Sequence, residues 1–333
     1  MKHINVALFV PHEGCPQQCV FCNQRHISGK TARLSAKNID EAVSAAGDAW
    51  AGTDDKREIA FFGGSFTAID RDYMLELLQA AHPYIDGKRF TGIRISTRPD
   101  AIDPEICRLL KQYGVTAIEL GAQSRSDSVL AMNRRGHTAQ DVVDASAFIK
   151  THGFELGLQM MTGMYGSSPE DCLLTARKIV ALKPKTVRIY PTVVLRGTHL
   201  EQLTATGEYH PQTLEEAIPL CAELLKIFFG SGIDVIRLGL HSGGGVEEGY
   251  LAGPYHPAFR ELCDATIYLE RARQALHDSI PEGGQATLCV TQNGVSQMTG
   301  HKRENLAILE SEGYRCKVRP CPGLKKYQVT VML

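Results

Sequence analysis

The sequence predicts an α/β protein in which repeated strand–helix units form a full or partial barrel, followed by a small α+β region. Two observations lead to this fold class. Short apolar or β-branched runs alternate with amphipathic helical stretches over most of the first 240 residues, and strands separated by helices of this length pair in parallel. Six or more such units favour a barrel over an open flat sheet. The alternation then ends at glycine- and proline-rich stretches, which indicates that a different architecture follows.

The strands and helices of the barrel can be assigned individually. The expected strands are the apolar runs, at residues 6–10, 58–62, 92–97, 116–120, 155–161, 186–190 and 234–238. The expected helices are the amphipathic stretches, near residues 36–50, 71–82, 104–112, 138–151, 169–182 and 213–230. Asp103-Pro104 and Ser168-Pro169 each place a polar cap before a proline and therefore mark helix starts. Active sites of such folds lie at the carboxyl ends of the strands, so functional residues are expected in the turns that follow them.

After residue 240 the pattern changes. Gly243-Gly244-Gly245 and the Gly253-Pro254 turn interrupt the periodicity before a helix near 257–278. A compact block then follows, with a strand at 286–291, a helix at 303–312 and strands at 314–319 and 326–332. The predicted division is a barrel at 1–240, a connecting loop and helix at 241–280, and a small α+β domain at 281–333.

Composition limits the class of protein. The chain has 333 residues and a formal net charge of −1, so it has enough apolar content for a sizeable core and no global field that attracts nucleic acid. We find no run of 18 apolar residues, which predicts no membrane span. The short apolar run at the N-terminus lacks a small-residue cleavage signal and is expected to be a buried first strand. Together these features predict a cytoplasmic protein.

The most informative feature is a run of three cysteines directly after the first strand. Cys15, Cys19 and Cys22 have C-x3-C-x2-C spacing, and thiolates favour soft centres such as iron–sulfur clusters and zinc. A [4Fe–4S] cluster usually takes four cysteines, so three would leave one iron open to a small molecule. Two alternatives remain at this point: a closed Cys3His zinc site completed by His12 or His26, and buried free thiols. The absence of a second CxxC pair disfavours zinc.

Other polar residues fall at the expected carboxyl ends of strands. Gly63-Gly64-Ser65 follows the second strand, and paired glycines let a ligand approach the backbone. Glu119 ends the fourth strand, with Gln123 four residues later and Arg135 beyond it. A carboxylate or amide can hold ribose hydroxyls, and an arginine can bind a carboxylate through two hydrogen bonds. Each of these residues, considered alone, also has a purely structural explanation. The paired glycines could form a tight turn, and the arginine could lie on a solvated face.

Three arginines also lie at or near strand ends, at Arg98, Arg188 and Arg237. An arginine inside a barrel rim is costly unless it pairs with a carboxylate or phosphate. One of them could be structural, but three indicate an anionic ligand.

The remaining cysteines are expected to be ordinary core residues. Cys107, Cys172, Cys221 and Cys263 fall within helical stretches and act as small hydrophobic residues. Cys289, Cys316 and Cys321 lie in the last fifty residues, where a second metal site is conceivable but the core interpretation is favoured. Ten scattered cysteines and no secretory leader predict no disulfides.

With these motifs in place, the chain resembles the radical S-adenosylmethionine (radical SAM) superfamily, and within it the Elongator catalytic subunit-like branch. The resemblance extends over roughly residues 5–240. It rests on the cysteine run and on the segments Phe61-Phe62-Gly63-Gly64-Ser65-Phe66-Thr67, Thr97-Arg98-Pro99-Asp100, Glu119-Leu120-Gly121-Ala122-Gln123-Ser124, Arg135-Gly136-His137-Thr138 and Arg188-Ile189-Tyr190-Pro191-Thr192.

The resemblance implies a partial TIM-type (β/α)6 radical SAM barrel that holds a [4Fe–4S] cluster on Cys15, Cys19 and Cys22. S-adenosylmethionine (SAM) would chelate the open iron, with Gly63-Gly64 near its amine. Ser65 stands where this motif usually has an acidic residue. Gln123, Arg135 and Gln159 resemble positions that contact ribose and carboxylate in oxygen-independent coproporphyrinogen oxidases. The chain has no counterpart of the acetyltransferase domain of Elongator subunits.

The function expected from this resemblance is reductive cleavage of SAM to a 5′-deoxyadenosyl radical, with an external electron donor. A tRNA, modified at a wobble uridine, or another RNA is the first expected substrate. One alternative keeps this chemistry and replaces RNA by a small anionic metabolite held by Arg98, Arg188 and Arg237. The other is a non-catalytic zinc or RNA-binding protein. The sequence does not determine the oligomeric state.

Overall fold

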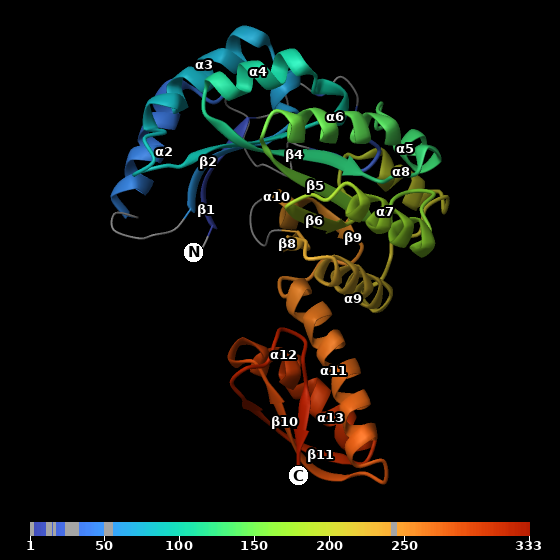
Figure 1. Cartoon of the computed structure of the whole chain (residues 1–333). Coiled ribbons are helices and arrows are strands. Elements are labelled where there is room, and N and C mark those ends of the chain that lie inside the picture. Colours follow the sequence, from blue (N-terminus) through green and yellow to red (C-terminus); the bar gives the residue numbers. More distant parts are fainter. Residues whose placement is uncertain (1–2, 11–14, 16–17, 24–32, 50–55, 241–244) are drawn as a thin grey trace.

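The computed structural model describes residues 3–10, 15, 18–23, 33–49, 56–240 and 245–333. Its largest sheet, within the described residues, has seven parallel strands in the order β1-β2-β3-β4-β5-β6-β8. The strands are β1 (His3–Val10), β2 (Lys56–Gly63), β3 (Gly92–Thr97), β4 (Val115–Gln123), β5 (Glu155–Thr162), β6 (Thr186–Pro191) and β8 (Asp234–Leu238). The sheet curls into a half-barrel (Figure 1). The predicted partial barrel is therefore confirmed, and each expected strand overlaps an observed one.

Helices cover the outer face of this sheet (Figure 1). They are α2 (Ala36–Ala49), α3 (Arg71–Ala81), α4 (Pro104–Gln112), α5 (Asp127–Met132), α6 (Ala139–Thr151), α7 (Pro169–Ala181) and α9 (Leu214–Gly230). The two predicted helix starts are confirmed. Asp103 accepts a hydrogen bond from the Ile106 amide, and Ser168 forms a capping box with Asp171. Each cap satisfies amides that the first turn leaves without helical partners.

The strands sort their side chains between two faces. Apolar residues such as Phe61, Ile95 and Leu120 pack against the helices in one continuous core. The inner face of the curled sheet carries polar side chains, among them Glu58, Arg94 and Glu119, all of which are buried. Successive strand residues point to opposite faces, so a sheet of this kind has a hydrophobic outside under the helices and a polar inside.

A second, smaller group of elements lies beside the cysteine run. It contains a two-stranded antiparallel ribbon of β7 (Val194–Leu195) and β9 (Tyr250–Ala252), together with α8 (His199–Ala205) and α10 (Gly245–Gly249). The sequence predicted none of these elements, because their short runs carry no clear periodicity. The ribbon and α8 pack around a separate core formed by Val20, Val194, Leu200, Leu203 and Tyr209. Helix α10 packs through Val246 in another small cluster, with Val193 and Leu195.

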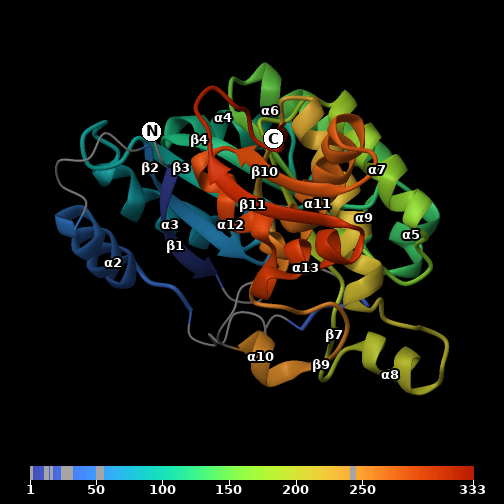
Figure 2. The same cartoon turned by 90° about the horizontal axis from the view of Figure 1, so that it is seen from below.

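One long helix, α11 (Phe259–Ser279), connects the barrel to the C-terminal region (Figures 1 and 2). This region contains β10 (Gly284–Val290), α12 (Val295–Thr299), α13 (Glu304–Ser311), β11 (Tyr314–Pro320) and β12 (Thr330–Met332). Its three strands form a sheet in the order β11-β10-β12, with β11 parallel and β12 antiparallel to β10. Short 3-10 turns occur at Phe66–Ala68, His82–Tyr84, Pro99–Ala101, Gln292–Gly294 and His301–Arg303.

The last strand is shorter than predicted. The sequence placed it at 326–332, whereas β12 covers only Thr330–Met332. Tyr327 takes a left-handed backbone conformation with φ of 61°, and its buried hydroxyl donates to Asp264 on α11. This anchor turns the chain away from the sheet just before the strand begins.

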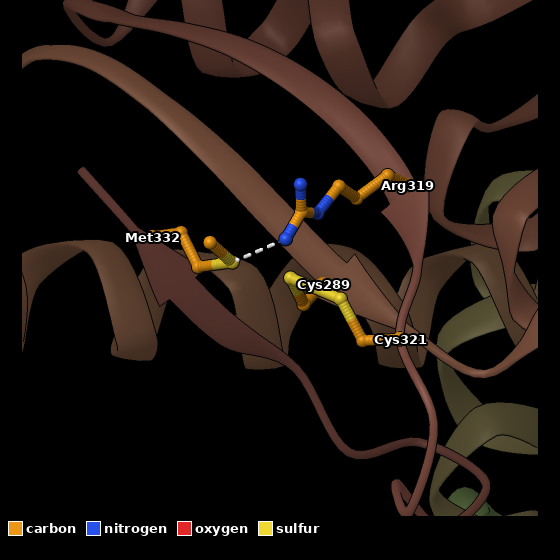
Figure 3. Close-up of a disulfide and its surroundings, with 4 residues drawn as sticks. All are labelled: Cys289, Arg319, Cys321 and Met332. Carbon is orange, nitrogen blue, oxygen red and sulfur yellow. Dashed lines mark hydrogen bonds between the residues drawn. A yellow bond between two sulfur atoms is a disulfide. The ribbon is translucent and has the colours of Figure 1, made fainter.

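One expectation about the cysteines is wrong. Cys289 and Cys321 form a disulfide with a Cα–Cα distance of 5.5 Å (Figure 3). The parallel register pairs Val290 with Pro320, and the Cys321 amide donates to the Val290 carbonyl at 2.8 Å, which brings the two cysteines together. Cys316 points to the other face of the sheet, against the core. The cysteines within helices, Cys107, Cys172, Cys221 and Cys263, are buried as predicted.

Within the described residues, none of the helices is both long and apolar enough to cross a membrane.

Candidate active site

The cysteine run lies at the carboxyl end of β1, at the rim of the half-barrel. Cys19 is buried and Cys22 half-buried, and the Cys22 amide donates to the Cys19 carbonyl at 3.1 Å. The pKa of the Cys15 thiol is raised by desolvation and by the neighbouring Cys19, while Arg98, Arg135 and a backbone hydrogen bond from Ser65 favour its thiolate. The run is therefore next to two arginines and one backbone amide that stabilise negative sulfur.

The side chain of Arg135 contacts one of these cysteines directly. Its Nη1 donates to the sulfur of Cys19 at 3.1 Å, and its Nη2 donates to the Gly121 carbonyl at 2.9 Å. The side chain is buried, and its Nε has no hydrogen-bond partner in the described part of the chain. A buried donor without a partner is unusual and identifies a place where a ligand can complete the hydrogen bonding.

The Gly63-Gly64-Ser65 turn packs against the end of β1. Gly63 has φ of +123°, and a Cβ there would lie 2.2 Å from the Val10 carbonyl oxygen, so only glycine fits. Ser65 is buried, and its hydroxyl pairs with Thr97 at 2.8 Å and accepts from the Arg98 amide at 3.1 Å. The hydroxyl of Ser65 therefore connects the turn to the end of β3. The backbone of Ser65 makes a hydrogen bond to Cys15.

Gln123 lies beside Arg135 at the end of β4. It has a left-handed backbone with φ of 62°, and its buried Oε1 has no partner among the described residues. A Cβ added at Gly121 would lie 3.1 Å from Gln123 Nε2 and 3.4 Å from Arg135 Nη2. The bare backbone of Gly121 thus leaves room for both side chains, and the structure brings these two predicted cofactor contacts together.

Glu119 and Gln159 take part in a buried polar network that also contains Arg188. Glu119 accepts from Arg188 Nε at 2.6 Å and Nη2 at 3.0 Å, and from Gln159 Nε2 at 3.2 Å. Arg94 Nη1 adds a fourth hydrogen bond at 3.3 Å. Three residues that the sequence predicted for the site, Glu119, Gln159 and Arg188, therefore form one cluster on the inner face of the sheet.

Arg94 on β3, which sequence reasoning missed, extends this network to Glu58 on β2 and to Glu155 on β5. Its Nε lies 2.7 Å from Glu58, and its Nη2 lies 2.7 Å from Glu155. Arg94 and Glu119 are each 1 % exposed. A single arginine within the otherwise apolar or small run 92–97 was the available signal, because a buried guanidinium requires carboxylates on neighbouring strands.

The other two predicted arginines differ in their pairing. Arg98 forms a bidentate ion pair with Asp100, at 2.9 and 2.7 Å, so an anionic ligand would compete with that carboxylate. Arg237 donates through Nε to the Gly239 carbonyl at 3.0 Å. Desolvation lowers the pKa of Arg237, and Tyr190 opposes that shift while Arg188 adds to it. Of the described residues, no carboxylate lies within ion-pair distance of Arg237.

Two further buried groups at the rim were also missed. His137 donates through Nε2 to the Ala122 carbonyl at 3.2 Å, and its Nδ1 has no partner in the described segments. Burial, with Arg135 as a second cause, lowers the pKa of His137 to about 4. Arg125 is also buried, and desolvation lowers the pKa of its guanidinium. The sequence around each residue has no periodic pattern that would predict its burial.

The ribbon and α8 hold the cysteine run in place. The Val20 amide donates to the Asn133 carbonyl at 3.2 Å, and the Leu200 amide donates to the Val20 carbonyl at 2.9 Å. Asn23 Nδ2 donates to the Arg196 carbonyl at 2.9 Å. The described part of the run is therefore fixed on both sides by backbone hydrogen bonds, as a precise ligand set requires.

His12 and His26, the candidate fourth ligands of the zinc alternative, lie outside the described residues. Within the described residues, no three His, Cys, Asp or Glu side chains are grouped as a metal site. The role of Cys15, Cys19 and Cys22 as ligands stays a prediction.

Family models match most of the chain. The model of the radical SAM superfamily matches residues 9–179, and the model of the radical SAM C-terminal domain matches residues 184–271.

Curated relatives agree with this family. A tRNA uridine(34) acetyltransferase of Dehalococcoides mccartyi is 27 % identical over 62 % of this chain and 52 % of its own length. One of Methanocaldococcus jannaschii is 32 % identical over 50 % of this chain and 34 % of its own length. Elongator complex protein 3 of Mus musculus is 28 % identical over 52 % of this chain and 35 % of its own length. The chain thus spans about half the length of these relatives, or less.

Solved structures share the fold. The archaeal Methanocaldococcus infernus Elp3 with an N-terminal deletion superposes with a TM-score of 0.62 and 23 % identity, covering 81 % of this chain and 63 % of that one. Streptococcus suis SuiB bound to S-adenosylmethionine gives 0.51 and 13 %, covering 72 % and 50 %. At these identities the likeness concerns the fold alone. The two family-model matches, the half-barrel and the cysteine run at its rim place the chain in the radical SAM superfamily of enzymes.

Proposed function

We propose that Cys15, Cys19 and Cys22 hold a [4Fe–4S] cluster and that SAM binds against the neighbouring rim of the half-barrel. The family implies both cofactors. The observation that carries the assignment to these residues is the contact between Arg135 and the sulfur of Cys19. A guanidinium on a buried sulfur favours the thiolate, which is the form that binds metal.

The surrounding residues fit a bound SAM. The donor set is three cysteines within eight residues, which suits iron–sulfur ligation. Gln123 Oε1 and Arg135 Nε are buried polar atoms without partners in the described chain, and both can be completed by the ribose and carboxylate of SAM. The glycine turn at 63–64 lies against the end of β1, and its lack of side chains lets an amine approach the backbone.

When bound, the cluster and SAM supply reductive cleavage of a carbon–sulfur bond, which gives a 5′-deoxyadenosyl radical that removes a hydrogen atom from the substrate. The protein's part is to bind, orient and shield. Arg135 and Gln123 orient SAM, and Ser65 holds its turn against β3. Glu119 and Gln159 lie in the buried network, where Glu119 accepts hydrogen bonds from both Gln159 and Arg188 and so fixes the inner wall of the site.

Within this scheme, we assign the substrate side to the three arginines, Arg98, Arg188 and Arg237. Arg98 and Arg188 each have a carboxylate partner. Arg237 is the one of the three whose guanidinium has no carboxylate within the described residues, so it is the strongest candidate for an anionic substrate group.

The proposed substrate is a tRNA, modified at a wobble uridine. Support comes from relatives named tRNA uridine(34) acetyltransferase and from the similarity to Elongator complex protein 3. Because the chain spans about half the length of those relatives or less, we do not propose that it transfers an acetyl group. The proposal includes a cytoplasmic location and an external electron donor. A small anionic metabolite is the second candidate, favoured by Arg237 alone.

The experiment is anaerobic reconstitution with iron and sulfide, followed by reduction in the presence of SAM and bulk tRNA. The expected result is 5′-deoxyadenosine, with more formed when tRNA is present. Formation that does not respond to tRNA but responds to small anionic metabolites would favour the second candidate. A colourless protein with bound zinc would contradict the cluster assignment.

A further inference from the structure

The C-terminal sheet has one face that no described helix covers. Its inner face packs against α11, α12 and α13 through residues such as Leu288, Val290 and Val318. On the outer face, β11 displays Arg315, Lys317 and Arg319, all exposed. Alternate residues of a strand point to the same side and lie about 6–7 Å apart, so these three cations form a straight row along one edge of the sheet.

No acidic residue of the sheet itself balances this row. The strands β10, β11 and β12 contain no Asp or Glu. Register places Gln285, Thr287 and Cys289 beside the three cations, and Thr330 and Met332 in the next column. Arg315 forms an ion pair with Glu310 at 3.5 Å, but both side chains are well exposed, and such surface pairs contribute little.

Arg319 lies across the sheet rather than toward an acid. Its Nη2 donates to the sulfur of Met332 at 2.9 Å, above the disulfide of Cys289 and Cys321 (Figure 3). A thioether is a weak acceptor, so most of the hydrogen-bonding capacity of this guanidinium remains available. The packing against the sulfur atoms orients the guanidinium without neutralising it.

The whole C-terminal block shares this sign of charge. Residues 284–333 contain seven Lys or Arg and three Asp or Glu, a balance of +4, in a chain whose total is −1. The preceding 283 residues therefore carry −5. Basic residues concentrated on one small domain of an otherwise acidic chain are the electrostatic footprint of a nucleic-acid partner.

We propose that the outer face of the C-terminal sheet, formed by Arg315, Lys317 and Arg319, binds the phosphate backbone of the RNA substrate. This proposal rests on the proposed function and specifies where its substrate docks. A row of point charges along a strand is complementary to a row of phosphates along an RNA strand. The outer face carries no aromatic side chain among β10, β11 and β12, so bases have no stacking platform. Binding at this face is therefore electrostatic and independent of RNA sequence.

The test is binding of bulk tRNA to the full-length protein over a range of salt concentrations. Replacing two phosphate-binding cations, in Lys317→Ala/Arg319→Ala, should weaken binding on the order of tenfold at about 50 mM salt and reduce the slope of log K against log salt by about 2. The control is Lys37→Ala/Lys185→Ala, which removes the same charge from exposed lysines of the barrel and should leave the slope unchanged. Because Arg319 also contacts the sulfur of Met332, Arg315→Ala/Lys317→Ala provides a second variant that leaves this contact intact.

Three outcomes would overturn the proposal. The first is an unchanged salt slope in both C-terminal variants. The second is self-association of the variants with unchanged tRNA affinity, since basic residues on an edge strand also prevent strand pairing. The third is that the wild-type protein binds phosphatidylcholine–phosphatidylserine vesicles but not tRNA. Formation of 5′-deoxyadenosine by the wild-type protein without RNA, measured in parallel, separates failure of this proposal from failure of the proposed function.

Discussion

Arg135 donates a hydrogen bond to the sulfur of Cys19 at 3.1 Å, although 116 positions separate the two residues. The same guanidinium reaches the Gly121 carbonyl at the end of β4. One side chain therefore connects the cysteine run, which follows β1, to the fourth strand of the half-barrel. This bridge joins the proposed cluster to the proposed SAM site.

Replacing Arg135 should separate these two roles. In Arg135→Ala, loss of a charged hydrogen bond to the carboxylate of SAM should weaken SAM binding by about tenfold to hundredfold. Cluster assembly, which depends on the cysteines, should change much less. Anaerobic equilibrium dialysis and iron analysis measure the two quantities. Arg134→Ala is the matched control, because Arg134 is exposed and its guanidinium lies 3.3 Å from the ring nitrogen of His199, away from the cysteines. Equal SAM affinity in the two variants would argue against the role given to Arg135.

The glycine turn gives a steric prediction. In Gly63→Ala, the new Cβ would lie 2.2 Å from the Val10 carbonyl oxygen, so the turn must move away from the strand that leads into the cysteines. We expect most of the cluster to be lost, as measured by iron and sulfide content after reconstitution. Gly87→Ala is the control, since Gly87 also has a positive φ but nothing within 4 Å of the added carbon. A Gly63→Ala protein that loads as much iron as the Gly87→Ala protein would contradict this account of the turn.

The buried network predicts a large loss of stability on removal of one charge. Glu119→Gln leaves Arg188 without its ion pair and weakens the pairing of Arg94, and breaking a buried pair in this way costs about 3–5 kcal/mol. The midpoint of urea unfolding measures the loss. In the exposed pair between Arg71 and Glu105, the corresponding Glu105→Gln change should cost less than about 1 kcal/mol. Similar midpoints for the two variants would show that the network contributes little.

His137 predicts a pH dependence of stability on the acid side. Its pKa in the folded protein is about 4, below the ordinary value near 6.5 for an unfolded chain. The unfolded state therefore binds more protons between these values, so His137 costs no stability above about pH 6.5 and destabilises the fold progressively as pH falls toward 4, by about 3 kcal/mol at most.

Thermal unfolding midpoints of the cluster-free protein at pH 7 and pH 5 test this sign. His137→Asn should show a smaller drop between the two pH values than the wild type. His277→Asn, a change at an exposed helical histidine, should behave as the wild type does. A drop in His137→Asn as large as in the wild type would assign the acid sensitivity to other groups.

The strands of the half-barrel and most of its helices were predictable from the sequence because each has a strong period and clear boundaries. The run at 92–97 becomes β3 with the predicted bounds, and Ser168-Pro169 begins α7 as expected. Local signals of this kind depend only on neighbouring residues. The rim location of the cysteine run followed from the same rule, since it comes directly after the first strand.

What the sequence did not predict depends on contacts between distant segments. The pairing of Arg94 with Glu58, Glu119 and Glu155 requires four strands, β2 to β5, to lie side by side. The β7–β9 ribbon pairs residues more than fifty positions apart, and its strands are too short for a recognisable period. The disulfide of Cys289 and Cys321 depends on the register of two parallel strands. In each case the register, and not the local composition, decides the contact.

The most direct test of the central claim compares wild type with Cys19→Ala after anaerobic reconstitution. The account predicts about four iron atoms per chain and formation of 5′-deoxyadenosine in the wild type. In Cys19→Ala it predicts loss of both, with the thermal midpoint of the cluster-free barrel preserved. A Cys19→Ala protein that keeps its full iron content and cleaves SAM would contradict the assignment of the cluster to these three cysteines.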